Sequence, residues 1–361
     1  MHGGDSHPRI EGPPPRRVAV LRALRLGDLL CAVPAFRALR SAWPDAEIVL
    51  IGLPWARGFV GRFAAYLDGF REFPGYPGLP ERAPEIGRIP GFLAEIQAER
   101  FDLAIQLHGS GPVVNPLVAL LGARRAAGFF LSGDYRLDPD LSLPWPDHGL
   151  EIRRLLALVE FLGARPRGEH LEFPLHAADR AALAAIDGAG DLGPRAYACL
   201  HPGASVPERR WPARHFAAVA DALAARGLRV ALTGTAAEAG LTREVARAMQ
   251  APSLDLAGRT DLGALAALID GARLLVSNDT GVSHVAAALK VPSVIVSTGD
   301  NPARWAPIDA DLHRVLCDPA GVSPDAVLAR AGELLDRETR SPAPSPAVAP
   351  EVDAVFGPLK G

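Results

Sequence analysis

A polar cluster late in the chain carries side chains well suited to binding a phosphate. It comprises residues 278–281 (Asn-Asp-Thr-Gly) and His284, one helical turn later. A run typical of a buried strand precedes it at 272–276, and a helical run follows it at 282–289. In an open parallel sheet, ligands bind where strands end and helices begin. The helix N-terminus offers unpaired N–H groups there, whereas capping alone would explain one of these residues but not the set.

Two further strand ends in the same half of the chain carry ligand-binding residue types. Ser205 is followed by Arg209 and Arg210, whose planar guanidinium groups suit a phosphate, although a solvated arginine pair before a helix has the same pattern. Glu238 follows the strand that ends near Thr233, where a carboxylate can accept hydrogen bonds from ribose hydroxyls. A first-turn glutamate favoured by the helix dipole is the alternative.

The N-terminal half contains one such cluster, Arg25-Leu-Gly-Asp28, between a predicted strand and a predicted helix. Taken alone, Asp28 could simply cap that helix. The four clusters all lie at the predicted carboxyl ends of strands, which favours a binding site over four independent caps.

Other motifs carry less chemistry. The letters G-x-G-x-x-G occur at 188–193, but they precede a predicted strand instead of following one, so the dinucleotide-binding mechanism fails. The sequence around Ser110 lacks the preceding glycine of a nucleophile elbow, which argues against a hydrolase. His108, His201 and His284 follow different strands without short ligand spacing, so we expect no metal site.

Composition limits the class of protein. The chain has 361 residues, 48% of them hydrophobic, which is enough for two domains. A net charge of −3 argues against nucleic-acid binding through bulk charge. The three cysteines are unclustered, which indicates a reduced, cytoplasmic protein. No apolar run approaches the ~20 residues of a membrane span, although peripheral contact with a membrane surface stays open.

Strand and helix patterns alternate along the chain, as in α/β proteins with parallel sheets. We expect strands at 17–22, 47–52, 102–107, 196–200, 228–233, 272–276 and 293–297. We expect helices at 29–42, 112–121, 150–163, 212–226, 241–249, 262–270, 282–289 and 324–337. The predicted organisation is a disordered leader (1–16), an N-terminal domain (17–186), a linker (187–194), a C-terminal domain (195–322), a C-terminal helix (323–338) and a disordered tail (339–361).

Six motifs, in this order and spacing, carry a family resemblance. They are Arg25-Leu-Gly-Asp28 with Pro34, Phe101 to His108, His201-Pro-Gly-Ala-Ser205 with Arg210-Trp-Pro, Leu256 to Leu262, Ser277 to Gly281 with His284, and Pro302 with Trp305-Ala-Pro307. From about residue 17 to residue 335 the chain resembles glycosyltransferase family 9, the lipopolysaccharide heptosyltransferase family.

The resemblance implies the GT-B fold, in which two Rossmann-like parallel-sheet domains face each other across a cleft. It also implies a metal-independent, inverting transfer of a sugar from a nucleotide donor, typically ADP-heptose. The acceptor would be a hydroxyl of a glycan or lipid-linked glycan on the N-terminal domain, and the donor would lie on the C-terminal domain. No cofactor is expected, because the nucleotide sugar is a substrate.

Residue roles follow from the same resemblance. Asp28 takes the position of the general base, and Glu238 the position that holds the ribose. The donor-side residues expected are Ser205, Arg209, Arg210, Thr233, Gly234, Glu238, Asn278, Asp279, Thr280, Gly281 and His284. The acceptor-side residues expected are Arg25, Gly27, His108, Arg57 and Arg62. Arg209 stands where the family often has lysine, which keeps the charge but changes its geometry.

Two questions stay open at this stage. The apolar and aromatic stripe at 52–70 could contact a lipid-linked acceptor, but a core helix explains it better. A GT-B transferase or epimerase that uses another nucleotide sugar is the alternative function, and a non-catalytic nucleotide-sugar-binding protein is a third. We expect a monomer.

Overall fold

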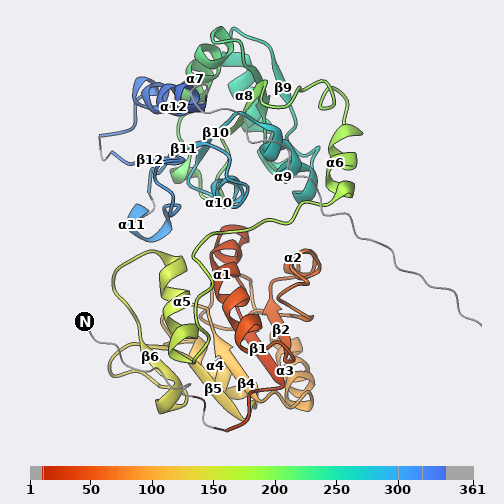
Figure 1. The fold of residues 1–361 in the computed structure, drawn as a ribbon, viewed down its shortest axis with the longest axis vertical. Coiled ribbons are helices and arrows are strands. Elements are labelled where there is room, and N and C mark those ends of the chain that lie inside the picture. The colour runs from red at the N-terminus through yellow and green to blue at the C-terminus, as the bar shows by residue number, and fades with distance from the viewer. Residues whose placement is uncertain (1–9, 11, 300, 319, 339–361) are drawn as a thin grey trace, which may run out of the picture.

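The computed structural model describes residues 10, 12–299, 301–318 and 320–338. The tail expected at 339–361 lies outside these residues, as does most of the leader expected at 1–16. The described chain forms two α/β halves, one above the other in Figure 1. Each half is built on a parallel six-stranded sheet with helices packed beside it.

The first sheet has the strand order β3-β2-β1-β4-β5-β6. Its strands are β1 (Arg17–Leu21), β2 (Glu47–Gly52), β3 (Gly69–Glu72), β4 (Leu103–Gln106), β5 (Arg125–Phe130) and β6 (Ser142–Pro144). The helices of this half are α1 (Leu26–Ala42), α2 (Ala56–Arg62), α3 (Ile89–Ala98), α4 (Val114–Leu120) and α5 (Glu151–Phe161). The apolar residues of the central strands are fully buried, which explains their continuous runs of Val, Ile and Leu.

The second sheet repeats this arrangement, with the order β12-β11-β10-β7-β8-β9. Its strands are β7 (Tyr197–His201), β8 (Arg229–Leu232), β9 (Ser253–Asp255), β10 (Leu274–Asn278), β11 (Ser293–Val296) and β12 (His313–Leu316). The helices are α6 (Ala177–Ala184), α7 (Ala213–Ala225), α8 (Ala239–Ala248), α9 (Leu262–Gly271), α10 (Gly281–Ala288), α11 (Pro302–Trp305) and α12 (Pro324–Glu338). Counted from its own first strand, each half therefore has the doubly wound order 3-2-1-4-5-6, whose reversal of direction creates a ligand-binding edge.

The strands and helices expected from the sequence are all present, with ends that differ by a few residues. The stripe at 52–70 is mainly core, as the simpler interpretation held. Phe59, Phe63 and Leu67 are almost fully buried, and the rings of Phe59 and Phe63 stack 4.3 Å apart. Trp55 is the exception, with 37% of its surface exposed.

The two halves share one apolar core. A continuous cluster of buried side chains includes α1 and β1 of the first half and α9, β10 and α10 of the second. Helix α6, which the predicted division places in the first domain, packs against α9. Its Asp179 also pairs with Arg62 of α2 at 2.6 Å, so α6 connects the halves. The boundary at residues 186–187 stays a prediction.

Candidate active site

The site forms where each sheet reverses its strand order. In the first half, Asp28 follows β1 and His108 follows β4, the two strands at the reversal. In the second half, the segment from His201 to Ser205 follows β7, and residues 279–281 follow β10. Because parallel strands present their carboxyl ends at one edge, the topology brings these separate motifs together.

The N-termini of α1 and α10 meet at two glycines. A β-carbon on Gly27 would lie 2.7 Å from Cδ2 of His284 and 3.2 Å from the α-carbon of Gly281. A β-carbon on Gly281 would lie 3.1 Å from the backbone nitrogen of Gly27. No larger residue fits either position without moving the helices apart. Figure 1 shows α1 rising toward α10 at this junction.

Asp28 lies in the first turn of α1 at this junction, and its side chain is half-buried. Burial is the largest influence on its carboxyl and raises the pKa above the ordinary value. Glu151 raises the pKa further, while Arg22 and Arg304 oppose the rise. A carboxylate with a raised pKa is a better proton acceptor near neutral pH than an ordinary aspartate.

A buried arginine supports the first turn of α1, which carries Asp28. Arg22 is fully buried, and its Nε donates a hydrogen bond of 2.8 Å to the backbone carbonyl of Asp28. The same guanidinium donates to the carbonyl of Leu107 and pairs with Glu151 at 3.3 Å. These roles were not predicted from the sequence. A charged residue at the end of an otherwise apolar strand was the available signal for Arg22, but nothing marked Glu151.

His108 supports the loop that precedes this turn. It is 5% exposed, and its Nδ1 accepts a hydrogen bond of 3.1 Å from the backbone N–H of Ala23. Its Nε2 lies 3.4 Å from a carboxylate oxygen of Glu81. A ring that accepts through Nδ1 carries its hydrogen on Nε2, which faces Glu81. In this arrangement His108 positions the loop between β1 and α1.

The N-terminus of α10 has the groups expected of an anion site. Thr280 is its N-cap residue, yet the Thr280 side chain makes no capping hydrogen bond. Its Oγ1 is buried and has no hydrogen-bond partner among the described residues. The backbone carbonyl of Thr280 does have a partner, because it accepts a hydrogen bond of 2.6 Å from the hydroxyl of Ser283. The group without a partner is the Thr280 hydroxyl. Such an oxygen beside a helix N-terminus fits a phosphate.

His284 is neutral at this junction. Burial, with a smaller contribution from His313, lowers its pKa to about 4. Its Nδ1 lies 3.7 Å from the Sγ atom of Cys31 on α1. Because the imidazole is uncharged, it can pack against α1 beside Gly27 without the free-energy cost of burying a charge.

Asn278 connects two of the predicted motifs and is fully buried. Its Oδ1 accepts from the backbone N–H of Trp211 at 3.0 Å, and its Nδ2 donates to the carbonyl of Pro202 at 2.8 Å. These bonds hold the segment after β7 against the end of β10. Asn278 therefore acts through the backbone that it positions.

Glu238 lies against the segment that follows β7. A β-carbon on Gly203 would come within 2.3 Å of its carboxylate, so a larger residue there would displace the Glu238 side chain from its present position. Its Oε2 accepts hydrogen bonds from the backbone and hydroxyl of Thr235, at 2.8 and 2.9 Å. The buried Thr233 hydroxyl lies 3.0 Å from Nδ1 of His201 and fixes that ring below Glu238. A β-carbon on Gly234, between these residues, would lie 3.3 Å from the β-carbon of Glu238.

The arginines after β7 differ in their surroundings. The guanidinium of Arg210 donates two hydrogen bonds to the carbonyl of Ala204, at 3.0 and 2.9 Å, which stiffens the loop. The stem of Arg209 lies near Gly299 in the loop after β11. Ser205 is exposed between these groups.

The acceptor-side arginines are spread over the first half. Arg25 is exposed and is the N-cap residue of α1, next to the candidate base. Arg57 is exposed on α2, and its guanidinium lies 5.0 Å from the ring centre of Phe70. Arg62 lies elsewhere, where it forms a two-pronged pair with Asp179, at 2.6 and 2.9 Å. In this structure Arg62 joins α2 to α6 instead of lying beside Asp28.

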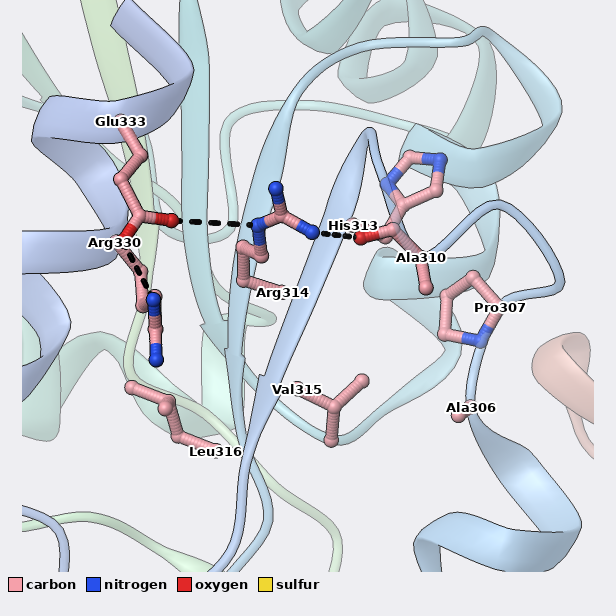
Figure 2. Close-up of a pocket in the computed structure, with 9 residues that line it drawn as sticks. All are labelled: Ala306, Pro307, Ala310, His313, Arg314, Val315, Leu316, Arg330 and Glu333. Carbon is pink, nitrogen blue, oxygen red and sulfur yellow. Dashed lines mark hydrogen bonds and ion pairs between the residues drawn. The ribbon is translucent and has the colours of Figure 1, made fainter.

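A separate cavity of about 500 Å³ lies between β12 and α12 (Figure 2). Its walls include Arg314, Arg330 and Glu333, and Glu333 pairs with Arg330 at 2.5 Å and with Arg314 at 3.7 Å. It contains none of the predicted site residues. Within the described ranges there is no cluster of His, Cys, Asp or Glu able to hold a metal, and no helix has the length and apolarity needed to cross a membrane.

Comparison with known proteins places this geometry in a family. The model of glycosyltransferase family 9 (heptosyltransferase) matches residues 92–328. Lipopolysaccharide heptosyltransferase 2 of Salmonella typhimurium is 27% identical over 304 residues, which cover 79% of this chain and 84% of the relative. Lipopolysaccharide heptosyltransferase 1 of Pseudomonas aeruginosa is 30% identical over 321 residues, 79% of each chain. The solved structure of Escherichia coli ADP-heptose heptosyltransferase II superposes with a TM-score of 0.70 at 24% identity, covering 90% of this chain and 99% of that one.

The paired 3-2-1-4-5-6 sheets, which meet through their carboxyl ends, have the GT-B fold of nucleotide-sugar glycosyltransferases. Within that class, the chain belongs to glycosyltransferase family 9, the heptosyltransferase family. The fold and family expected from the sequence are thus confirmed, and the protein is a glycosyltransferase enzyme.

Proposed function

We propose that this enzyme transfers a heptose from ADP-heptose, with inversion, to a hydroxyl of a lipopolysaccharide-core-like acceptor. The observation that carries the proposal is the junction of α1 and α10 at Gly27 and Gly281. At this junction the first turn of α1, which carries the half-buried Asp28, lies against the N-terminus of α10, which follows Thr280. A base and an anion-binding group on opposite sides of one junction suit displacement at an anomeric carbon.

In the proposed reaction, the acceptor oxygen attacks the anomeric carbon from the face opposite the leaving diphosphate. The new C–O bond forms as the bond to the phosphate oxygen breaks, and the acceptor proton passes to Asp28. Inversion follows from the single displacement. The raised pKa of Asp28 supports this assignment, because a proton acceptor works best when its pKa approaches the working pH.

The diphosphate would lie at the N-terminus of α10, where the partial positive charge and the N–H groups stabilise developing negative charge. The orphaned Thr280 hydroxyl can donate to a phosphate oxygen. Asp279 is itself an anion, so we assign it a role in orienting backbone groups. Glu238 would accept from the ribose hydroxyls after exchanging its bonds to Thr235.

The acceptor would approach from the first half. Trp55 and Arg57, exposed at the start of α2, offer an apolar surface and a cation for a lipid-linked, anionic glycan. Peripheral contact with the inner membrane belongs to the same proposal.

Substitution of Asp28 by Asn tests the chemical step. We expect Asp28→Asn to lower kcat by about 10²–10⁴-fold while ADP still binds, because the side chain keeps its shape but loses the base. Asp45→Asn, an exposed aspartate just after α1, is the matched control and should retain full activity. Transfer is measured with ADP-heptose and a heptose-deficient core acceptor, and the product anomer by NMR. Full activity of Asp28→Asn would refute the assigned base.

The donor is tested separately by thermal shift with ADP, UDP, GDP and CDP, each with and without Mg²⁺. A ligand that binds only the native state raises the melting temperature by mass action. Selective stabilisation by ADP, unchanged by Mg²⁺, is expected. Stabilisation by UDP or GDP instead would keep the fold and replace the donor.

A further inference from the structure

Helix α11 of the second half reaches the first half close to Asp28. Arg304 lies in this four-residue helix, and its Nε donates a hydrogen bond of 2.9 Å to Oε2 of Glu151 at the start of α5. Figure 1 shows α11 at the lower edge of the second half, next to the end of α5. A charged contact therefore joins the two halves beside the candidate base.

Glu151 transmits this contact toward Asp28. It is 2% exposed, and its other oxygen, Oε1, lies 3.3 Å from Nη2 of Arg22. Arg22 in turn binds the backbone carbonyl of Asp28 through Nε at 2.8 Å. Three direct contacts thus lead from α11, through α5 and the end of β1, to the first turn of α1.

The surroundings of Arg304 fix its guanidinium in this place. It lies 4.6 Å from the ring centre of Trp305 and 5.6 Å from that of Trp145, distances at which cations bind aromatic faces. Arg154, beside Glu151, lies 5.0 Å from the same Trp145 ring and 3.7 Å from Oε2 of Glu151. The Arg304 side chain is 32% exposed, whereas the Glu151 side chain is 2% exposed. Arg304 is therefore the one member of the Arg304–Glu151–Arg22 chain that can leave when the halves separate.

We propose that Arg304 is a positioning residue for the transfer reaction: by binding Glu151 across the interface, it fixes the Arg22 guanidinium and hence the loop of the catalytic base. We call Arg304, Glu151 and Arg22 the interdomain clasp. The contacts of the clasp do not depend on the proposed function, but their effect on catalysis does, because it requires Asp28 to be the base. It makes the alignment of that base depend on the approach of the second half, which carries the donor site.

The clasp also sets the electrostatic environment of Asp28. The charged groups that face it are Arg22 from β1, Glu151 from α5 and Arg304 from α11. Cys31 on α1 is buried and its pKa is raised, and His284 on α10 is neutral, so neither contributes a charge near neutral pH. Removal of Arg304 should raise the pKa of Asp28, whereas removal of the negative charge of Glu151 should lower it.

The test compares Arg304→Met, Arg304→Lys and Glu151→Gln, with Arg243→Met, an exposed arginine of α8, as the control. We expect Arg304→Met to lower kcat about tenfold or more with little change in the KM for the donor, because misalignment of a reacting group slows the chemical step. Arg304→Lys should recover part of the loss. The acidic limb of the kcat/KM profile should move up by about half a pH unit in Arg304→Met and down in Glu151→Gln.

Hydrogen exchange gives a readout that does not depend on activity. In Arg304→Met, amides at the start of α5 and in the loop at 22–25 should exchange faster than in the parent protein and in Arg243→Met. The proposed role of Arg304 would be refuted if the acidic limb of the kcat/KM profile moved in the same direction in Arg304→Met and Glu151→Gln. Unchanged hydrogen exchange at the start of α5 in Arg304→Met would also refute it. Should Asp28→Asn stay active, the proposed base fails, and the exchange data still decide whether Arg304 orders the loop.

Discussion

The two halves of this enzyme repeat one strand order but support their ligand-binding loops with different chemistry. In the first half, buried charges support the loop of Asp28: Arg22 and Glu151 pair with 0% and 2% of their side chains exposed. In the second half, a neutral amide has the central position: Asn278 is fully buried and bonds the backbone of Trp211 and of Pro202. The charged side chain that binds this segment, Arg210, is only half-buried.

This difference matches the role proposed for each half. A buried carboxylate that is to act as a base needs cations nearby: burial raises the pKa of Asp28, and Arg22 and Arg304 limit the rise. A diphosphate site needs its helix N-terminus and hydroxyl donors left open to the ligand, and a neutral support such as Asn278 does not compete for the anion. The same topology therefore serves two kinds of chemistry through the residues beneath the loops.

The largest effect should come from breaking the charged support. Arg22→Met removes a fully buried partner of Glu151 and the donor to the carbonyls of Asp28 and Leu107. It should lower the free energy of unfolding by about 3–5 kcal/mol in urea titrations. Arg153→Met is the matched control, because it breaks an Arg–Glu pair of 2.9 Å on the surface, where solvent screens the charges and the stability should change little. The double variant Arg22→Met/Glu151→Leu should regain part of the loss. Equal costs for Arg22→Met and Arg153→Met would contradict a buried, coupled network.

Breaking the neutral support should cost less. Asn278→Ala leaves the N–H of Trp211 and the carbonyl of Pro202 without partners, which should cost about 1–3 kcal/mol. It should also weaken ADP binding, because the segment after β7 loosens, while the acidic limb of the activity profile stays in place. Gln250→Ala, at an exposed position, is the control. A shifted acidic limb in Asn278→Ala would mean that the supports of the two halves are not separate.

The sequence predicted the strand ends that carry the site, because polar residues after apolar runs mark them directly. Asp28, Glu238 and the segment 278–281 all lie where those patterns placed them. Whether each binds substrate in the proposed way stays a prediction. The patterns missed five strands, β3, β5, β6, β9 and β12. All but β5 are short and lie at sheet edges, whereas β5 lies between β4 and β6. Three or four residues with half-buried side chains leave too weak a periodic signal.

The supporting residues could not be read from the sequence for a different reason. Glu151 lies far along the chain from Arg22, and Arg304 lies in the other half, so no spacing relates them. Glu151 and Arg304 have the pattern of ordinary surface charges until the fold brings them to Arg22. The same holds for Arg62, which the family pattern suggested for the acceptor side and which the fold pairs with Asp179.

The last test separates the halves by the sign of their pH dependence. The pKa of His284 is about 4 in the fold and near 6.5 when unfolded, so the unfolded chain binds more protons between these values. Its contribution to stability is complete above pH 6.5 and is lost as the pH falls toward 4, by up to about 1.4 kcal/mol per pH unit. His313, whose pKa burial also lowers to about 4, contributes with the same sign.

Asp28 acts in the opposite direction. Because its pKa is raised in the fold, the folded chain binds more protons than the unfolded chain between the unfolded and the folded pKa of this carboxyl. Its contribution to stability therefore falls as the pH rises through that interval. Urea titrations between pH 4 and 7 should therefore show a shallower slope for His284→Gln and a steeper one for Asp28→Asn. His313→Gln should match His284→Gln and serves as the internal control. If His284→Gln and Asp28→Asn changed the slope in the same direction, the assigned protonation states of one half would be wrong, and the contrast between a charged and a neutral site would fail with them.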